Sequence, residues 1–200
     1  VLSANGYLVY AGARKDDDLK RLEAMKNVES VRLDVTVQAD IDAAVKLIKN
    51  KGRGLDGLVN NAGIASAGPL IEVPIAELES LFDVNVYGPY RVTQAFAPLL
   101  IENKGRIVNI GSVTGIFSGS MSGIYSMSKH AVEAYTDSLA AEMERFGVKV
   151  SVVEPGTYAS DSAKSAAKRL ENKAIWSDSS AYKAERDLMK LAKTSDTSAK

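Results

Sequence analysis

Short runs of β-branched and other apolar residues alternate along this chain with longer amphipathic segments. These runs predict strands, which are Tyr7–Arg14, Val28–Val35, Leu55–Asn60, Arg106–Gly111 and Val148–Val153. Such alternation is typical of a parallel sheet whose strands are joined by helical crossovers. The sequence therefore predicts a fold of the α/β class.

The segments between the predicted strands carry helical patterns. Ile41, Val45 and Ile48 form one apolar stripe, and three acids open the first of these segments, where they favour a helix N-terminus. The predicted helices are Asp16–Asn27, Ala39–Lys51, Ile75–Asn103 and Ile124–Phe146. A loop with Gly68 and Pro69 precedes the third of them.

The character of the chain changes after Gly156, so we divide it into a core, residues 1–156, and a tail, residues 157–200. The tail is rich in Ser, Ala, Lys and Asp, with weaker helical patterns at Ser162–Asn172 and Ser180–Ala192. It is either a partly mobile surface segment or a lid over a site at the carboxyl ends of the strands.

Composition excludes several classes of function. The 200 residues suit one domain, and 46% hydrophobic content is enough to bury a sizeable core. The 25 basic and 25 acidic residues balance, so bulk charge suggests no nucleic-acid partner. No cysteine is present and His130 is the single histidine, so we expect no metal site. No apolar run has the roughly 20 residues needed to span a membrane, and we expect a cytoplasmic protein.

Tyr125 and Lys129 stand four residues apart in a predicted helix, and Ser112 lies thirteen positions before Tyr125. Residues i and i+4 of a helix share one face, with Cβ atoms roughly 5–6 Å apart, so the phenol and the ammonium can converge. A nearby cation favours phenolate and is expected to lower the tyrosine pKa from about 10 toward the range of an acid/base catalyst. A surface pair without chemistry is the alternative.

Several short motifs occur together in one order. They are Asn60-Asn61-Ala62-Gly63, Asn85 within Asp83-Val84-Asn85-Val86, Ser112 after Ile107-Val108-Asn109-Ile110-Gly111, Tyr125-x-x-x-Lys129 and Pro155-Gly156. Over about Tyr7 to Gly156 the chain resembles the classical branch of the short-chain dehydrogenase/reductase family. That resemblance implies a Rossmann-like, doubly wound parallel sheet in a three-layer αβα arrangement.

The resemblance also implies catalytic roles. Tyr125 would exchange a proton with the substrate oxygen, Lys129 would lower its pKa and bind the nicotinamide ribose, and Ser112 would stabilise charge on the same oxygen. Asn85 would hold a water in a proton relay with Lys129. Structural alternatives are open for two of them: Ser112 could only shape a turn, and Asn85 could only satisfy backbone within its helix.

A pyridine nucleotide is the implied cofactor. Arg14 and Lys15 end the strand whose tip meets the adenosine 2′-position, and no acid stands there, which favours NADP(H) over NAD(H). Asp16–Asp18 partly offset those cations, and a solvated basic strand end is the alternative. By resemblance, the other cofactor-binding residues are Asp34, Val35, Asn61, Ala62, Gly63, Tyr125, Lys129, Pro155, Gly156 and Tyr158.

The family's first strand, glycine-rich turn and first helix have no counterpart before Tyr7. Gly52–Gly57 matches G-x-G-x-x-G, but it follows a predicted helix and opens a strand, so we interpret it as a connecting turn. We also find no convincing last strand after Val153. The sequence is therefore expected to be a fragment, or a short form with poor stability and very weak nucleotide binding, and the retained catalytic set favours the fragment.

We expect an NADP(H)-dependent oxidoreductase that interconverts an alcohol and a carbonyl. The rival hypotheses are a non-catalytic binding protein on the same fold, and an isomerase or dehydratase using the same tyrosine. Ile64, Leu70, Ile71, Ile175 and Trp176 suggest a moderately apolar small-molecule substrate. By resemblance, the two long predicted helices form a homodimer or homotetramer interface, with packing against the lone sheet as the alternative.

Overall fold

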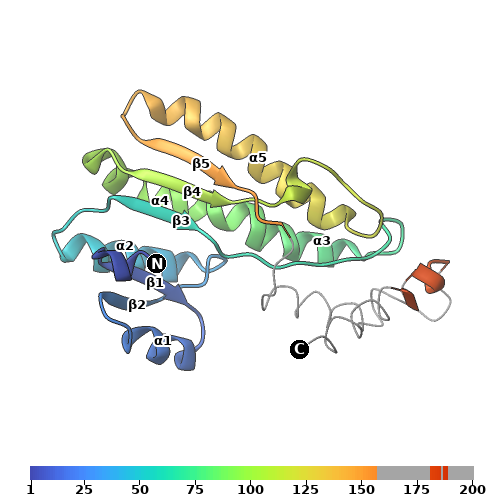
Figure 1. Cartoon of the computed structure of the whole chain (residues 1–200), viewed down its shortest axis with the longest axis horizontal. Helices are drawn as coiled ribbons and strands as arrows, with labels where there is room; N and C mark the ends of the chain where they lie inside the picture. Colours follow the sequence, from blue (N-terminus) through green and yellow to red (C-terminus); the bar gives the residue numbers. More distant parts are fainter. Residues whose placement is uncertain (157–180, 186, 189–200) are drawn as a thin grey trace.

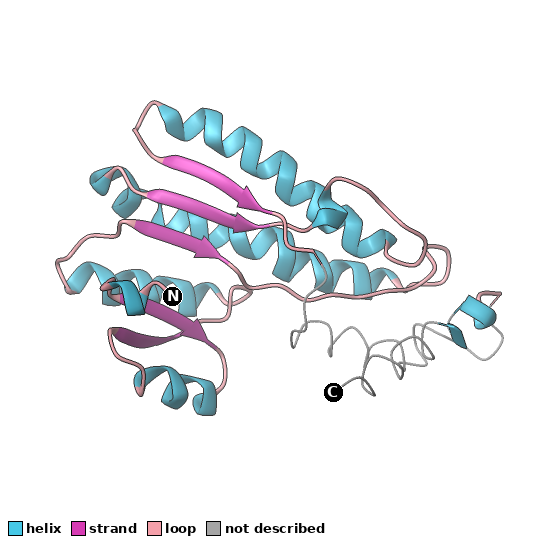
Figure 2. Cartoon of the chain, in the orientation of Figure 1, coloured by secondary structure: helices cyan, strands magenta, loops and turns pink. Residues whose placement is uncertain are grey.

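The computed structural model describes residues 1–156, 181–185, 187 and 188. Helices and strands alternate from β1 to β5 (Figures 1 and 2). In chain order they are η1 (Ser3–Asn5), β1 (Val9–Ala13), α1 (Asp16–Glu23), β2 (Val28–Arg32), α2 (Gln38–Asn50), β3 (Gly57–Asn60), α3 (Ile75–Phe82), η2 (Asp83–Tyr87), α4 (Gly88–Asn103), β4 (Arg106–Ile110), η3 (Val113–Gly115), α5 (Gly123–Glu144) and β5 (Lys149–Val153).

The strands form two parallel sheets. β1 pairs with β2, and β3, β4 and β5 form the second sheet in that order. Each predicted strand is present, although most are a few residues shorter than their apolar runs. The Rossmann-like α/β class that the sequence predicts is confirmed, with a sheet that is only partly represented.

Figure 1 places β1 on the side of its sheet that is nearer β3. No strand among the described residues pairs with both of them, so the two sheets are not joined by backbone hydrogen bonds. The family resemblance predicts an additional central strand at this position. Unpaired strand edges are costly to bury, because their amide and carbonyl groups lack partners.

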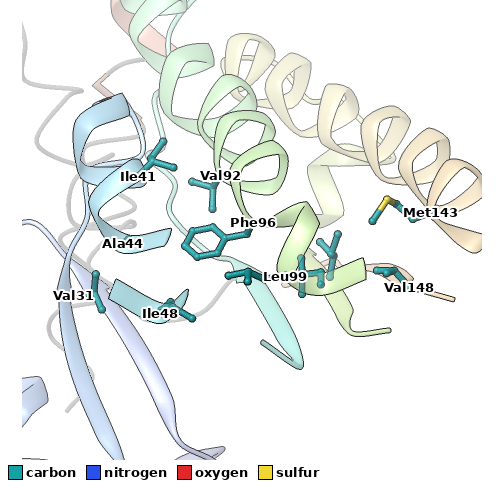
Figure 3. Packing of buried hydrophobic residues seen from close by; sticks show 11 residues of the cluster. Val31, Ile41, Ala44, Ile48, Val92, Phe96, Leu99, Met143 and Val148 are labelled. Carbon is teal, nitrogen blue, oxygen red and sulfur yellow. The ribbon is translucent and has the colours of Figure 1, made fainter. Parts of the chain in front are cut away.

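The hydrophobic core joins both sheets through the helices that pack on them (Figure 3). α2 contributes Ile41, Ala44 and Ile48, while α4 contributes Val92, Phe96, Leu99 and Leu100. Val31 of β2, Ile107 of β4, and Met143 and Val148 near β5 complete the cluster. The predicted stripe of α2 packs on α4, so side-chain packing rather than strand pairing attaches the smaller sheet to the larger one.

The long predicted helix Ile75–Asn103 is not a single α-helix. It contains a π-helical turn, η2, between α3 and α4. Such turns are frequently found at functional sites. Gly88 follows this turn, and a Cβ at that position would lie 2.6 Å from a methyl group of Val35. Close packing of α4 on the segment after β2 therefore requires glycine here.

The Gly52–Gly57 segment joins α2 to β3, as the sequence predicts for a connecting turn. Gly52 and Gly54 have positive φ angles of 66° and 70°, which a side chain would disfavour. The helix predicted for Asp16–Asn27 ends earlier, at Glu23, and Asn27 adopts a left-handed conformation with φ 58°. Asparagine tolerates that conformation better than most residues do.

Most of the predicted tail lies outside the described residues, including Tyr158, Ser162–Asn172, Ile175 and Trp176. Within Ser180–Ala192, residues 183–185, 187 and 188 are helical. The Ala181 amide donates a hydrogen bond to the Glu72 carboxylate at 3.1 Å, and Tyr182 belongs to the same apolar cluster as Ala67, Val73 and Met121. This part of the tail thus contacts the loops that follow β3 and β4.

Candidate active site

Each strand end contributes a residue that the sequence singles out. Arg14 follows β1, Asp34 lies beyond β2, Asn61 follows β3, Ser112 follows β4 and Pro155 lies beyond β5. Because the strands within each sheet are parallel, these residues lie at the carboxyl edges of the sheets. Open α/β sheets bind ligands at this edge.

Ser112 is buried directly after β4 and has extended backbone angles. Its hydroxyl oxygen accepts hydrogen bonds from the Thr114 amide at 3.2 Å and the Thr114 hydroxyl at 3.0 Å, and it caps η3. The turn-forming role considered for this residue is therefore real. It leaves the Ser112 hydroxyl proton available for another acceptor.

Tyr125 lies in the first turns of α5, with its side chain beside Ser112. Burial raises the pKa of the Tyr125 phenol, and side-chain hydrogen bonding with Ser112 opposes that rise in part. This corrects the expectation that Lys129 lowers the pKa of Tyr125. The reason is geometric, because the Lys129 Nζ lies 5.7 Å from the centre of the tyrosine ring and donates its hydrogen bond elsewhere.

Lys129 follows Tyr125 by one helical turn and is only 5% exposed. Its Nζ donates to the Ile110 carbonyl oxygen at 2.7 Å, at the end of β4. Burial lowers the pKa of Lys129 to about 8, and the charge of Glu133 opposes that change. An ammonium has three donors, so two of them remain for other partners.

Asn85 is buried in the π-helical turn. Its side-chain oxygen accepts from the Ile64 amide at 2.8 Å, and its side-chain nitrogen donates to the Ile64 carbonyl at 2.9 Å and to Ser128 at 3.1 Å. The amide group thus pairs with the backbone as a neighbouring strand would. It fixes the loop after Asn61-Ala62-Gly63 to α5.

Gly63 brings this loop close to the lysine. A Cβ on Gly63 would lie 3.5 Å from the Asn85 side-chain oxygen and 3.9 Å from the Lys129 Nζ. Asn61, Ala62 and Gly63 are exposed. The structure therefore brings Gly63, Asn85 and Lys129 together beside an open stretch of backbone.

Arg14 and Asp34 form an ion pair, with 3.5 Å between Arg14 Nη1 and Asp34 Oδ2. Burial acts to raise the pKa of Asp34, but hydrogen bonds from Thr36 and the Arg14 charge outweigh it and hold that pKa below its ordinary value. The Arg14 side chain is 62% exposed and can contact a further anion. Val35 is turned toward α4, where it packs against Gly88.

The segment after β5 is attached to the serine loop. The Val113 amide donates to the Pro155 carbonyl at 3.2 Å, and the Gly111 amide donates to the Val153 carbonyl at 2.8 Å. Pro155 is half-buried and Gly156 is exposed. Tyr158, the remaining predicted cofactor contact, lies outside the described residues.

Sequence reasoning did not find three groups that support this site. Ser128 accepts from Asn85, and the Ile110 carbonyl accepts from Lys129. Ser66, in the loop after β3, donates to Glu77 of α3 at 2.7 Å. A backbone carbonyl leaves no trace in residue identity. Ser128 lies inside the Tyr125-x-x-x-Lys129 motif, where its spacing from Asn85 is visible only after folding.

The described residues thus combine a parallel α/β fold with Ser112, Tyr125 and Lys129 side chains gathered near the carboxyl end of β4. The family model for short chain dehydrogenases matches residues 1–171. The chain belongs to the short-chain dehydrogenase family.

Relatives extend that assignment. The chain is 39% identical over 167 residues to the mitochondrial D-beta-hydroxybutyrate dehydrogenase of Bos taurus, covering 78% of this chain and 48% of the relative. It is 41% identical over 152 residues to a 3beta-hydroxysteroid dehydrogenase of Caenorhabditis elegans, covering 74% and 39%. The chain thus spans about half the length, or less, of these curated relatives.

A gluconate 5-dehydrogenase of Burkholderia cenocepacia, solved in complex with NADP and tartrate, has a similar structure. The TM-score is 0.75 at 26% identity, over 82% of this chain and 66% of that one. Within the described residues, no group of three or more His, Cys, Asp or Glu side chains is placed to hold a metal ion. No described helix combines the length and apolar character needed to cross a bilayer.

Proposed function

We propose that this protein is an NADP(H)-dependent oxidoreductase that interconverts an alcohol and a carbonyl, with Tyr125 as the general acid/base. The observation that carries the proposal is the convergence of Ser112 and Tyr125 side chains beside the buried Lys129 ammonium. Membership of the short-chain dehydrogenase family and the dehydrogenase names of its relatives support it.

In carbonyl reduction, the reacting oxygen gains negative charge and needs a proton. Burial keeps the Tyr125 phenol protonated near neutral pH, so the phenol is ready to act as donor. The Ser112 hydroxyl can donate to the same oxygen while it accepts from Thr114. Donors that are fixed before reaction stabilise developing charge without reorganisation.

Lys129 has a second task in this proposal. Its Nζ would lie 3.9 Å from a Cβ on Gly63, so beside this glycine its remaining donors can bind ribose hydroxyls and replace the proton lost by Tyr125. We assign Asn85 the role of holding a water between Lys129 and solvent. Its amide group is already locked by Ile64 and Ser128, so it supports this role mainly by fixing the local backbone.

The described residues fit a pyridine nucleotide. Arg14 presents an exposed cation at one end of the carboxyl edge, and Lys129 presents spare donors at the other, beside the side-chain-free Gly63. Asp34, Val35, Asn61, Ala62, Pro155 and Gly156 would line the cofactor between or beside these ends. When bound, the cofactor supplies hydride for reduction and accepts it in oxidation.

NADP(H) is favoured over NAD(H) because Arg14 offers a cation where the adenosine 2′-phosphate is expected. The solved relative from Burkholderia cenocepacia binds NADP, which supports the same choice. The Asp34 carboxylate neutralises part of the Arg14 charge. A free side of the guanidinium still remains, since its side chain is more exposed than buried.

We propose an apolar or partly apolar carbonyl substrate. Leu70, Ile116 and Phe117 are each at least 60% exposed on the loops that follow β3 and β4. Leu70 approaches Gly123, two residues before Tyr125, so this apolar surface borders the proposed site. One relative is named as a steroid dehydrogenase, which agrees with such a surface.

We further propose a homodimer or homotetramer through α4 and α5. A surface groove between them is lined by Tyr90, Thr93, Gln94, Ala97, Ala134, Tyr135, Ser138, Leu139 and Glu142. Tyr90 is 55% exposed, and its ring centre lies 5.9 Å from that of Tyr135.

The expected cytoplasmic location stays a prediction, because the hydroxybutyrate relative is by name mitochondrial.

The decisive experiment is Tyr125→Phe in the full encoded chain, assayed by NADPH consumption with a panel of carbonyl compounds. Removal of the proton donor should lower kcat by about 10²-fold or more, with little change in NADPH affinity. Tyr7→Phe, at an exposed tyrosine before β1, is the matched control and should keep near-normal kcat. Full activity of Tyr125→Phe would exclude this function, and turnover without NADPH oxidation would favour an isomerase or dehydratase.

A further inference from the structure

Glu133 of α5 is a half-buried acid that the proposed chemistry does not use. Its Oε1 atom is shielded from solvent and has no hydrogen-bond partner among the described residues. Buried polar atoms without a partner are uncommon, because removing them from water is costly. An atom of this kind therefore calls for a reason.

The Glu133 carboxyl group lies against the loop that carries Ser112. A Cβ added to Gly111 would be 2.5 Å from Oε1, and one added to Gly115 would be 2.8 Å from the same atom. The carboxyl group thus fills the space beside two glycines that bracket Ser112. Their missing side chains allow the loop to rest directly on α5.

Glu133 also lies one helical turn beyond Lys129, on the same face of α5. Its charge is the one electrostatic influence from the described residues that opposes the lowering of the Lys129 pKa. Burial raises the pKa of Glu133 itself, followed by the charges of Glu154 and Asp137, while Lys129 and His130 lower it. The pKa of Glu133 is therefore set by its burial together with two anions and two cations beside the proposed site.

We propose that Glu133 is a positioning residue, which seats the Ser112 loop against α5 and supplies a counter-charge that keeps Lys129 protonated. It touches neither substrate nor cofactor and acts through Ser112 and Lys129. This inference rests on the proposed function for its meaning in catalysis. Its two physical parts can be tested without turnover.

Three variants of the full encoded chain separate these parts. Glu133→Gln keeps the shape and removes the charge, while Glu133→Ala removes both. Asp137→Asn is the matched control, since it removes an acid one turn further along α5. The readouts are NMR titration of the Lys129 Nζ, amide hydrogen exchange of residues 111–116, and the pH profile of kcat/KM.

Glu133→Gln should shift the Lys129 titration and the alkaline limb of kcat/KM to lower pH, with a roughly threefold or larger loss of kcat/KM above pH 8. Amide exchange of residues 111–116 should stay slow in Glu133→Gln and become faster in Glu133→Ala. Asp137→Asn should change neither readout by as much. If Glu133→Gln does not fold, Glu133→Met replaces it as the uncharged variant of similar volume.

A wild-type Lys129 titration in Glu133→Gln would overturn the proposal, as would unchanged exchange of the loop in Glu133→Ala. An equal shift in Asp137→Asn would also overturn it. Failure of the wild-type chain to reduce any carbonyl would instead count against the proposed function. The titration and exchange results would then still decide the role of Glu133.

Discussion

Lys129 is the residue at which burial and charge conflict most clearly. Only 5% of the residue is exposed, and the fold compensates its ammonium with the Ile110 carbonyl and the charge of Glu133. A group held in this way loses its proton more easily than a free lysine. That property suits proton exchange near neutral pH.

The stability of the fold should therefore depend on pH through Lys129. Its pKa is about 8 in the folded chain, below the ordinary lysine value of 10.5, so the unfolded chain binds more protons between these two values. The free energy of unfolding should rise as pH increases through that window, by up to roughly 3 kcal/mol. Below about pH 8 the full cost of burying the charge remains.

Urea unfolding of wild type and Lys129→Met between pH 7 and pH 10 measures this contribution. At pH 7 the wild type carries the cost of burying the Lys129 charge, and Lys129→Met does not. We expect any advantage in unfolding free energy that Lys129→Met has at pH 7 to shrink, or to reverse in favour of wild type, as pH rises. Parallel pH profiles for both proteins would contradict the assignment.

Arg14 is the residue on which cofactor choice depends. We predict that Arg14→Ala weakens NADPH binding by about tenfold or more, since a charge-assisted contact to the phosphate is lost, and changes NADH binding much less. Fluorescence titration with both cofactors measures the two affinities. Arg21→Ala, another exposed arginine of the same region, is the control. Equal losses for NADPH and NADH in Arg14→Ala would refute the NADP(H) preference.

At the scale of elements, helix α5 and the turn η2 carry most of the site. The sequence places Tyr125 and Lys129 on one helix face correctly, because the i, i+4 spacing is local. It does not reveal the π-helical turn at Asn85, because a turn of this kind is defined by its backbone hydrogen bonds, which residue identity over five positions does not specify. The prediction that Lys129 lowers the pKa of Tyr125 is also wrong. The outcome depends on which acceptor the ammonium binds, and here that acceptor is the Ile110 carbonyl.

Strand lengths show a similar limit. The apolar runs locate every strand, but the structure ends β2 at Arg32, three residues before the predicted end. Leu33 and Val35 pack against the core, and the Leu33 amide still donates to the Ala13 carbonyl at 2.9 Å, although the strand has ended. An apolar pattern records burial, and it does not distinguish a buried loop from a strand end.

At the scale of the whole molecule, the two sheets differ in support. β4 is paired on both sides, whereas β1 and β2 have only each other within the described residues. The smaller sheet is attached to the larger one mainly by the packing of α2 on α4. Side-chain packing alone gives less resistance to local opening than packing together with a continuous ladder.

We therefore predict that, in the chain of 200 residues, backbone amides of β1 and β2 exchange with solvent about tenfold or more faster than those of β4. Hydrogen-exchange mass spectrometry on peptides covering these strands tests it, and the β4 peptide serves as the internal reference. Equal protection of the two sheets would show that the packing of α2 on α4 couples them fully.

By itself, the sequence determined the α/β class and the order of strands and helices, because both follow from residue periodicity. Its resemblance to the family singled out Ser112, Tyr125 and Lys129 as candidates, and only the spacing of the last two is local to one helix. Only the tertiary structure decided that Arg14 pairs with Asp34, that Asn85 binds Ile64, and that Glu133 lies beneath the Ser112 loop. Such contacts join residues far apart in the chain, or depend on burial, and local pattern records neither.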